Sequence, residues 1–520
     1  MGGGGGRDGR AKLGGVGGRG RLGLDYGNSR ERLTRPGSRR DGGAKDDVAI
    51  DPADPVRQFR EASWEEALAR AAEGLKSIRD DHGGRALAGF GSAKGSNEEA
   101  YLFQKLVRTG FGSNNVDHCT RLCHASSVAA LMQTIGSGAV TAPFTDALAA
   151  EVIVVIGCNP PVNHPVAATY FKQAVKNGAK LIVIDPDGLA LRQYATWMLN
   201  LRPATDVALL NAMLHVIIEE DLVDHDFIAR RTEGFAELSA HVKAFPPEAM
   251  AEVTGVPADA VREAARAFAT AKTAMVFWGM GISQHIHGTD NARCLISLCL
   301  ATGQVGRAGS GLHPLRGQNN VQGASDAGLI PMVYPDYQAV GDAAAQAKFE
   351  AFWQTELDPQ PGLTVVEITD AIHGGDIRGL YIMGENPAMS DPNLNHARAA
   401  LAKLEHLVVQ DIFLTETACY ADVILPASAW PEKDGTVTNS NRQVQIGRQA
   451  VAPPGSARQD LWIIGQMAQG LGLDWHYSGA EDVFAEMRQC MNSIHGMTWQ
   501  RLQDEDAITY PCLQEGDPSQ

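Results

Sequence analysis

The feature that most constrains the fold of this chain is a strand–turn–helix–strand unit that occurs twice. Each copy has an apolar run, a Gly-x-Asn-Pro turn, a predicted helix and a second apolar run that ends at an aspartate. The first copy occupies 151–185 and the second 379–411. Apolar runs of this length, separated by helices, are typical of strands buried on both faces of a parallel sheet. The sequence therefore predicts an α/β protein with two doubly wound αβα domains and mostly parallel sheets, plus a small partial domain from the chain ends.

The two turns predict binding of nucleotide-bearing ligands. A glycine at the end of a strand lets the backbone approach a phosphate at the next helix N-terminus, and an aspartate at the following strand end can bind a ribose or base. The glycine-to-aspartate spacing is 28 positions in one copy and 27 in the other. The positions concerned are Gly157, Asn159 and Asp185, and then Gly384, Asn386 and Asp411. An old duplication without a ligand remains the alternative.

A short stretch before the first copy, 117–127, is crowded with metal-binding side chains. It contains His118, Cys119, Cys123 and His124. Structural zinc usually needs two ligand pairs separated by a dozen or more residues, and this chain has one dense cluster only. We interpret Cys119 as a core cysteine. Cys123 is different, because it lies beside His124 and Arg121, cations that favour a thiolate.

Another polar segment, 311–324, follows the first copy. Its many amides surround Arg316 and include Gln318. We interpret this segment as a site that binds polar groups and one anion, and an exposed structural loop is the alternative.

Composition limits the partners and the compartment. The formal net charge is −16, and the basic residues concentrated in 1–45 leave a strongly acidic remainder. An acidic body repels phosphates, so nucleic acid is not an expected partner. The eight cysteines have no even spacing, which indicates a reducing compartment. No apolar run reaches membrane-spanning length and no secretory signal is present, so we expect a cytoplasmic protein without a membrane span.

Local patterns suggest domain limits. The Gly- and Arg-rich segment 1–50 is predicted to be flexible, and Ser63 with Glu66 predicts a capping box at the start of the first long helix. The expected domains are an αβα domain from 51–118 with 319–430, a second αβα domain over 119–318, and a partial domain over 431–520 that packs on the core.

Three motifs, at 119–129, 279–285 and 316–324, stand out in the sequence. They resemble motifs of the molybdenum bis-pterin oxidoreductases, and more narrowly of the catalytic alpha subunit of formate dehydrogenase. The resemblance covers about residues 20–520. It implies oxidation of formate to carbon dioxide at molybdenum held between two pterin guanine dinucleotides. It also implies that Cys123 is the metal ligand, His124 a proton acceptor and Arg316 the anchor of the formate carboxylate. The cofactor-binding positions that motifs and turns together predict are Gly157, Asn159, Asp185, Gly281, Ser283, Gln284, Gly317, Gln318, Gly384, Asn386 and Asp411.

The chain departs from this family at both ends. Family members carry an N-terminal four-cysteine motif for a 4Fe-4S cluster, but Gly17 and Arg19 occupy the last family Cys and Lys positions, and no cysteine precedes Cys119. The family's C-terminal β-rich domain is also missing. The sequence therefore predicts a cofactor pocket open on one side and no adjacent iron–sulfur cluster.

Three functions follow from these observations. The first is formate oxidation, with electrons passed to a flavin and iron–sulfur subunit that resembles NADH dehydrogenase, and with NAD as the candidate final acceptor. The second is reduction of another small oxyanion, against which the combination of Cys123, His124 and Arg316 argues. The third is a non-catalytic molybdopterin-binding or assembly subunit, which the missing ends favour.

Overall fold

The computed structural model describes residues 26–43, 45, 55–188 and 190–518. The chain divides into two compact units. In the described residues, the first unit comprises Leu122–Gly317 with Ser440–Arg442, and the second takes its residues from Gly18–Arg121, Gln318–Asn439 and Gln443–Gln520. Each unit is described separately below.

The first unit is built on a five-stranded sheet whose paired strands are all parallel. Its strand order is β7 (Trp197–Leu199), β6 (Lys180–Ile184), β5 (Val152–Ile156), β8 (Ala274–Trp278) and β9 (Gly311–Pro314). Its α-helices are α4 (Ala125–Ile135), α5 (Pro160–Asn163), α6 (Pro165–Lys176), α7 (Asp206–Glu219), α8 (His225–Arg231), α9 (Phe235–Val242), α10 (Pro247–Thr254), α11 (Ala258–Ala269), α12 (Met280–Ser283) and α13 (Gly288–Ala301).

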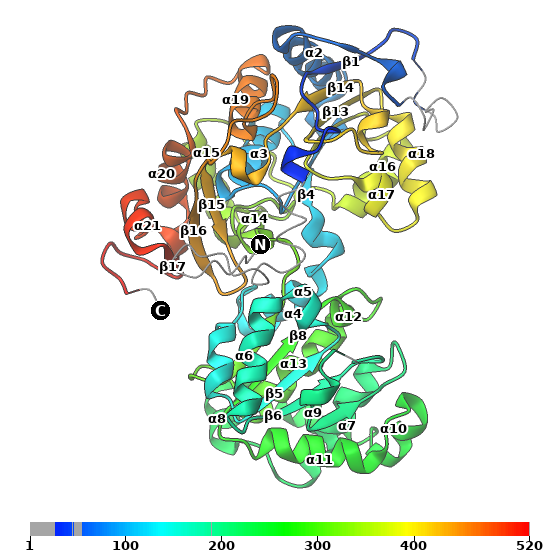
Figure 1. The fold of residues 1–520 in the computed structure, drawn as a ribbon, viewed down its shortest axis with the longest axis vertical. Coiled ribbons are helices and arrows are strands. Elements are labelled where there is room, and N and C mark those ends of the chain that lie inside the picture. Colours follow the sequence, from blue (N-terminus) through cyan, green and yellow to red (C-terminus); the bar gives the residue numbers. More distant parts are fainter. Residues whose placement is uncertain (1–25, 44, 46–54, 189, 519–520) are drawn as a thin grey trace. The chain divides into compact units, whose positions relative to one another are not determined.

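Both faces of this sheet are buried in separate hydrophobic cores. Val154 of β5 and Val276 of β8 belong to the core that also includes residues of α7, α11 and α13. The alternate residues Ile153 and Met275 belong to the core that includes α6. Because successive strand residues point to opposite faces, these two cores lie on opposite faces of the sheet. Helices therefore cover both faces, and the unit is a doubly wound αβα domain (Figure 1).

The second unit is built on a seven-stranded mixed sheet. Its strand order is β2 (Phe59–Glu61), β1 (Gly37–Arg39), β14 (Val423–Pro426), β13 (His406–Asp411), β12 (Gly379–Met383), β3 (Leu87–Gly91) and β4 (Val116–His118). The five strands from β14 to β4 pair in parallel, whereas β1 and β2 add to the edge in antiparallel fashion. A smaller, three-stranded sheet consists of β15 (Gly435–Thr438), β16 (Gln443–Gly447) and β17 (Ala507–Thr509). Separately, β10 (Val333–Tyr334) and β11 (Gln338–Ala339) form a short two-stranded sheet.

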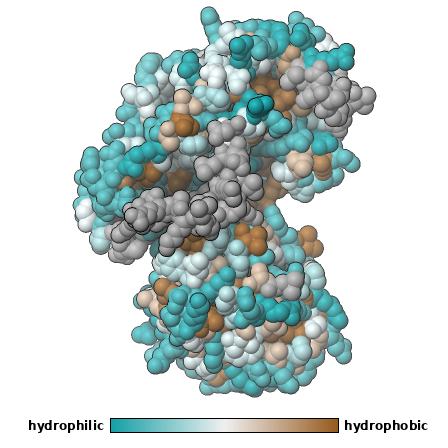
Figure 2. Space-filling model, viewed as in Figure 1, coloured by the Kyte–Doolittle hydropathy of each residue, from teal (hydrophilic) through white to brown (hydrophobic). Residues whose placement is uncertain are grey.

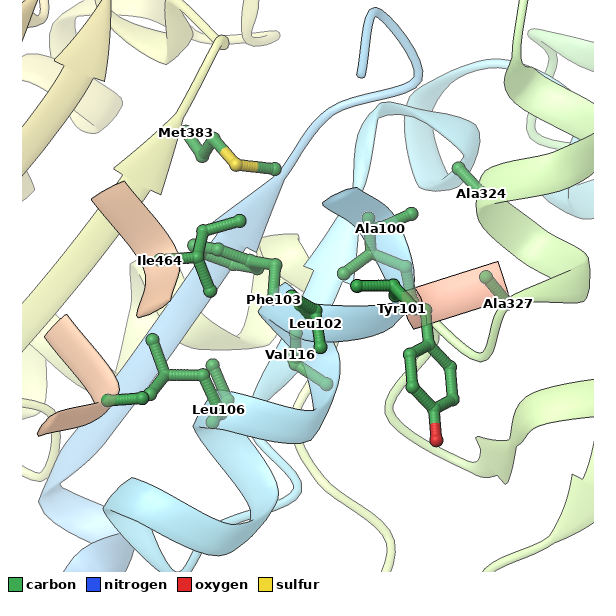
Figure 3. Close-up of a cluster of buried hydrophobic side chains, with 14 of the residues drawn as sticks. Ala100, Tyr101, Leu102, Phe103, Leu106, Val116, Ala324, Ala327, Met383 and Ile464 are labelled. Atoms are coloured by element: carbon green, nitrogen blue, oxygen red, sulfur yellow. The ribbon is translucent and has the colours of Figure 1, made fainter. Parts of the chain in front are cut away.

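Helices cover this sheet as well. They are α2 (Trp64–His82), α3 (Asn97–Leu106), α14 (Val321–Asp326), α15 (Ala343–Trp353), α16 (Val365–Gly374), α17 (Pro387–Ser390), α18 (Leu394–Lys403), α19 (Asp460–Gly470), α20 (Ala480–Cys490) and α21 (Trp499–Glu505). Every residue of α3 is buried, and Phe103 and Leu106 pack with Val116 of β4, Met383 of β12 and Ile464 of α19 in one core (Figure 3). The segment after β16 is thus part of this unit.

The α/β fold with mostly parallel sheets is confirmed, but two local predictions are wrong in part. The expected flexible segment 1–50 includes β1, which pairs with β14; residues 1–25 lie outside the described part. The expected capping box at Ser63 is half formed, because Ser63 accepts a hydrogen bond from the Glu66 N–H while the Glu66 carboxylate pairs with Arg60. The polar segment 311–324 begins with β9 and ends with the start of α14, and residues 315–320 between them form a loop.

On the face shown in Figure 2, hydrophilic residues cover most of each unit, and apolar residues appear as scattered spots. None of the helices in the described residues is both long enough and apolar enough to span a bilayer.

Candidate functional site

The first Gly-x-Asn-Pro turn lies at the carboxyl end of β5. Gly157 has a φ of 58°, and its N–H donates to the Ile184 carbonyl of β6 at 3.0 Å. The Gly281 N–H at the start of α12 donates to the Gly157 carbonyl at 2.9 Å. The left-handed conformation and this close approach both require glycine. The turn therefore exposes backbone at the edge of the sheet where ligands of such folds bind.

A cavity of about 220 Å³ opens beside this turn. It is lined by Cys158, Asn159, Val183, Asp185, Asp187, Gly188, Ala190 and Leu191. The Asn159 side-chain amide has no hydrogen-bond partner in the described part of the chain. One Asp185 carboxylate oxygen accepts from the N–H groups of Asp187 and Gly188, at 2.9 and 2.8 Å. These hydrogen bonds hold together three of the residues that line the cavity. Asn159 and Asp185 thus face a space that can take a polar ligand.

The second copy of the turn, in the other unit, uses its residues differently. Gly384 again has a positive φ, 67°, and its N–H donates to the Gln410 carbonyl at 2.9 Å. The Asn386 side-chain carbonyl, however, accepts from the Thr417 N–H at 3.0 Å, and its NH₂ donates to Glu416 at 2.7 Å. Asp411 is buried, and desolvation raises its pKa to about 6. The repeat is therefore a repeat of backbone shape, while the side chains have different contacts.

Cys123 lies just before α4, in the first unit, with its Sγ 3.3 Å from the Sδ of Met280. Burial raises the pKa of the Cys123 thiol, and the opposing influences are the charge of Arg316 and the backbone N–H groups of Gly317 and His124. The expectation that Arg121 and a charged His124 favour the thiolate is wrong. Arg121 is paired with Asp117 at 2.8 Å, and the cation that acts on Cys123 is Arg316.

His124 is fully buried and neutral. Its Nε2 lies 2.9 Å from the Leu315 carbonyl, and its Nδ1 lies 3.3 Å from the Ser283 hydroxyl. Because a carbonyl can only accept, Nε2 carries the proton and Nδ1 is the acceptor. Burial, followed by the positive charge of Arg316, lowers the pKa of His124 to about 3. The imidazole therefore presents a lone pair at Nδ1.

Arg316 follows β9 and is 3% exposed. One Nη2–H donates to the Gly138 carbonyl at 2.6 Å. The Nε and Nη1 atoms are buried and have no hydrogen-bond partner in the described residues. The Arg316 carbonyl lies 2.6 Å from Nε2 of His164, which holds the backbone in place. A buried guanidinium with unpaired N–H groups is costly unless an anion binds it.

Of the four remaining predicted residues, Ser283, Gln284 and Gly317 make contacts within the first unit, and Gln318 does not belong to it. The Ser283 hydroxyl lies 2.6 Å from that of Ser127, and Gln284 donates to the Leu122 carbonyl at 2.6 Å, so both hold α12 against the segment that carries Cys123. Gly317 supplies an N–H to Cys123. Gln318 belongs to the other unit, where its side-chain carbonyl is buried and has no partner among the described residues.

The crowded stretch 117–127 is not a protein-only metal centre. No group of three or more His, Cys, Asp or Glu side chains in the described residues is arranged to hold a metal ion. His118 contacts the hydroxyls of Ser325 and Thr120, and Cys119 belongs to the hydrophobic core of the second unit. Cys123 is therefore a candidate for a single protein ligand to a metal whose other ligands come from a bound group.

Sequence reasoning missed four residues near Cys123 and Arg316. Met280 contacts Cys123, His164 holds the Arg316 carbonyl, Ser127 extends the hydrogen-bond chain of His124, and His313 lies on β9. Met280 and His313 are inside polar or glycine-rich motifs that the sequence does single out. Ser127 is also inside a motif, 119–129, but nothing in the motif shows which hydroxyl it contacts. His164 gave no signal, because its role depends on which carbonyl the fold brings to it.

Comparisons with known proteins agree with this geometry. The family model described as molybdopterin oxidoreductase matches residues 32–469. The chain is 43% identical, over 94% of its length and 69% of the relative's, to an "F420-dependent formate dehydrogenase subunit alpha" of Methanocaldococcus jannaschii. It is 40% identical, over 88% of its length and 64% of the relative's, to formate dehydrogenase H of Escherichia coli.

A solved structure shares the fold. Acetylene hydratase from Pelobacter acetylenicus superimposes with a TM-score of 0.76 over 93% of this chain and 67% of that protein, at 23% identity. At this level of identity the likeness concerns the fold alone.

Proposed function

Because the chain belongs to the molybdopterin oxidoreductase family, we propose that it is the catalytic subunit of a formate dehydrogenase and oxidises formate to carbon dioxide. The observation that carries this proposal is the guanidinium of Arg316, buried with Nε and Nη1 unpaired in the described residues. A carboxylate that docks on either edge of the guanidinium uses one of these two nitrogens. Formate is the smallest carboxylate, and its binding would compensate the buried charge.

The residues of the first unit fit the family's molybdenum–pterin cofactor. The cavity beside Gly157 and the open Asn159 amide suit a nucleotide-bearing pterin, and the half-buried Cys123 offers one soft ligand atom. We assign Gly157, Asn159, Asp185, Gly281 and Gly317 to one guanine dinucleotide, and Gln318, Gly384, Asn386 and Asp411 to a second. When bound, the cofactor supplies the acceptor for the two electrons that formate releases along with carbon dioxide and one proton.

Cys123 and Arg316 position the reacting groups in this proposal. Arg316 fixes the carboxylate, and its charge acts on Cys123, which indicates that the two side chains share one environment. A fixed carboxylate leaves the formate C–H as the group that faces the metal ligand. Ser283 and Gln284 act as positioning residues, because they fix α12 against the Cys123 segment.

His124 is the proton acceptor in this proposal. Its Nε2–H is fixed on the Leu315 carbonyl, so only Nδ1 can take up the proton released by formate. The Ser283 hydroxyl, which donates to Nδ1, has to turn away when this happens. Bound formate would favour the step, because its negative charge opposes the positive charge of Arg316 that lowers the pKa of His124.

The relatives' names describe subunits, and partner subunits are therefore part of the proposal. We expect a flavin and iron–sulfur subunit resembling NADH dehydrogenase to take the electrons in the cytoplasm. The sparing use of cysteine in the sequence supports this compartment.

Formate-dependent dye reduction by molybdenum-loaded protein tests the function. We expect Cys123→Ala and Arg316→Lys each to lower kcat/KM for formate by about 10²-fold or more, because a lysine cannot reproduce the planar fork of a guanidinium. Arg293→Lys is the matched control, since Arg293 is exposed in the same unit and pairs with Asp290.

Two outcomes would contradict the proposal. If either active-site variant oxidised formate as fast as the unsubstituted protein, the substituted residue would not have the role assigned to it. An unsubstituted protein that retains molybdenum and both pterins but does not oxidise formate would instead favour the alternative, a non-catalytic pterin-binding or assembly subunit; reduction of another small oxyanion by that protein would favour a reductase.

A further inference from the structure

The tip of one hairpin belongs to the first unit. Residues Ser440–Arg442, between β15 and β16, are grouped with Leu122–Gly317 by their contacts. The Phe144 N–H donates to the side-chain carbonyl of Asn441 at 3.0 Å, and Asn441 is 4% exposed. The tip is thus seated on the segment around Phe144.

The segment around Phe144, residues 138–144, also contacts Arg316 and His313. The Gly138 carbonyl accepts from Arg316, and the Ala142 carbonyl lies 2.9 Å from Nδ1 of His313. The ring of Phe144 lies 6.2 Å from the ring of His313, centre to centre. His313 is fully buried, three positions before Arg316 in the chain. The hairpin tip and the candidate anion site are therefore connected through one short segment, 138–144.

Arg442, at the hairpin tip, has no counter-charge among the described residues. Its backbone has a φ of 65°, which is unfavourable for any residue with a side chain. Its Nε is buried and unpaired, and no carboxylate in the described residues forms an ion pair with it. Its charge nevertheless acts on His313, as does the charge of Arg316. Two guanidinium groups therefore bear on the same buried imidazole, and both have donors without acceptors.

A bound anion would satisfy both groups. Two positive charges near a neutral imidazole repel each other, and the repulsion disappears when an anion binds near them. A strained backbone that presents an unpaired donor is typical of a functional position. In the described residues no acidic side chain forms an ion pair with either guanidinium, and both groups keep N–H donors that an anion can use.

We propose that Arg442 is a second oxyanion-binding residue, which acts beside Arg316. This inference rests on the proposed function in one respect, namely that formate is the substrate. The carboxylate of formate on its way to Arg316 is one source of the oxyanion, and a phosphate of the bound dinucleotide is the other. In both cases Arg442 provides charge and N–H donors, and takes no part in bond breaking.

The test compares Arg442→Gln with Arg442→Lys and with Arg448→Gln. Arg448 is exposed just beyond β16 and controls for the loss of one positive charge. If Arg442 binds formate, we expect Arg442→Gln to raise KM for formate about tenfold with kcat within twofold, and Arg442→Lys to recover most of the change. If it binds a cofactor phosphate, we expect molybdenum and guanine nucleotide content to fall in Arg442→Gln, with KM unchanged in the loaded fraction.

A second measurement does not depend on turnover. The relaxation of ¹³C-formate and of ³¹P in inorganic phosphate is recorded with cofactor-free protein. If Arg442→Gln broadens either signal less than the unsubstituted protein does, and Arg448→Gln does not, the result supports oxyanion binding by Arg442. This conclusion would hold even if the loaded protein failed to oxidise formate, a failure that would refute the proposed function alone. Unchanged KM, cofactor content and broadening in Arg442→Gln would overturn the inference.

Discussion

Gly157 and Gly281 lie back to back, and each occupies the space that a side chain on the other would need. The Gly281 N–H donates to the Gly157 carbonyl at 2.9 Å. A Cβ on Gly157 would lie 2.9 Å from the Gly281 carbonyl carbon, and a Cβ on Gly281 would lie 2.7 Å from the Gly157 Cα. This contact joins the turn after β5 to the start of α12, and so connects the candidate dinucleotide site to the helix that holds the Cys123 segment.

We expect Gly157→Ala to lower the free energy of unfolding by about 2–4 kcal/mol. The left-handed backbone costs an alanine roughly 1–2 kcal/mol, and the overlap with backbone atoms that cannot move adds a similar amount. Gly136→Ala is the matched control, because Gly136 has a φ of 73° but nothing within 4 Å of the added Cβ. Urea unfolding of both variants should therefore give a larger loss for Gly157→Ala. Equal losses would mean that the contact with Gly281 contributes nothing.

The order of elements in the first copy of the repeated unit could be predicted from the sequence. The strand, turn, helix and strand expected over 151–185 correspond to β5, the turn at Gly157, α6 and β6. Their patterns are local, since an uninterrupted apolar run can only be stable when both faces are covered. The strand β1, Gly37–Arg39, was missed because Gly-Ser-Arg has no strand pattern. It is held by pairing with Val423 and Ile424, far away in the sequence.

The candidate site was predictable only where a motif marks it. Cys123, His124 and Arg316 stand in motifs, and the structure brings them into one unit. The protonation of His124 was not predictable, because it depends on burial and on Arg316, which is distant in sequence. The backbone carbonyls of Gly138 and Leu315, which hold Arg316 and His124, carry no sequence signal. Arg442 reaches this unit through a hairpin whose strands belong to the other one.

A chain of hydrogen bonds orients the imidazole of His124. The Trp278 Nε1–H donates to the Ser127 hydroxyl at 2.8 Å, the Ser127 and Ser283 hydroxyls are 2.6 Å apart, and Ser283 reaches Nδ1 of His124. Ser283→Ala would leave the buried Ser127 O–H without its acceptor and the buried Nδ1 of His124 without its donor, while Ser127 keeps the hydrogen bond from Trp278. We expect a loss of about 1–3 kcal/mol in the free energy of unfolding, measured in urea.

The same variant separates positioning from binding. We expect kcat for formate to fall and KM to stay within about twofold, because Ser283 acts on the proton acceptor and not on the carboxylate. Thr169→Ala, which removes an exposed hydroxyl from α6, controls for a general effect of losing a hydroxyl. A rise in KM at constant kcat would contradict the assigned role.

Lys433 in the second unit is a buried cation between two carboxylates. Its Nζ lies 2.8 Å from Glu99 and 3.0 Å from Asp460, and both pairs are almost completely shielded from water. Lys433→Met would leave two uncompensated buried carboxylates, so we expect the free energy of unfolding to drop by about 3–5 kcal/mol at pH 7. Adding Glu99→Gln should recover part of this loss. Additive losses in the double variant would show that the lysine and the glutamate are not coupled.

The stability of the Lys433→Met variant should also depend on pH in a defined direction. Without the lysine, desolvation would raise the pKa values of both carboxyls above those of the unfolded chain. A raised carboxyl pKa stabilises the fold at low pH and loses that contribution as the pH rises through the folded value. The deficit of the variant relative to the unsubstituted protein should therefore shrink when unfolding is measured at pH 5 instead of pH 7. A constant deficit would contradict the raised pKa values, because it would mean that both carboxyls stay ionised in the folded variant between pH 5 and pH 7.

His313 should make the protein sensitive to acid. Burial, followed by the charges of His164, Arg316 and Arg442, lowers the pKa of His313 to about 3, while the unfolded value is the ordinary 6.5. Below pH 6.5 the unfolded chain binds a proton that the folded chain does not. The free energy of unfolding therefore falls by up to about 1.4 kcal/mol per pH unit from this residue, between pH 6.5 and 3.

His313→Asn isolates that contribution. Asparagine can still donate to the Ala142 carbonyl but cannot take up a proton, so contributions from all other groups are common to both proteins and cancel. We expect the variant to be less stable at pH 7, because a smaller side chain leaves space between Phe144 and Phe277. The difference in the free energy of unfolding between the two proteins, measured in urea, should shrink steadily as the pH falls from 6.5 to 4.5. His287→Asn, at an exposed position, should show no such change. A gap that stays constant for His313→Asn would mean that His313 is protonated in the folded protein, and that an anion already compensates Arg316 and Arg442.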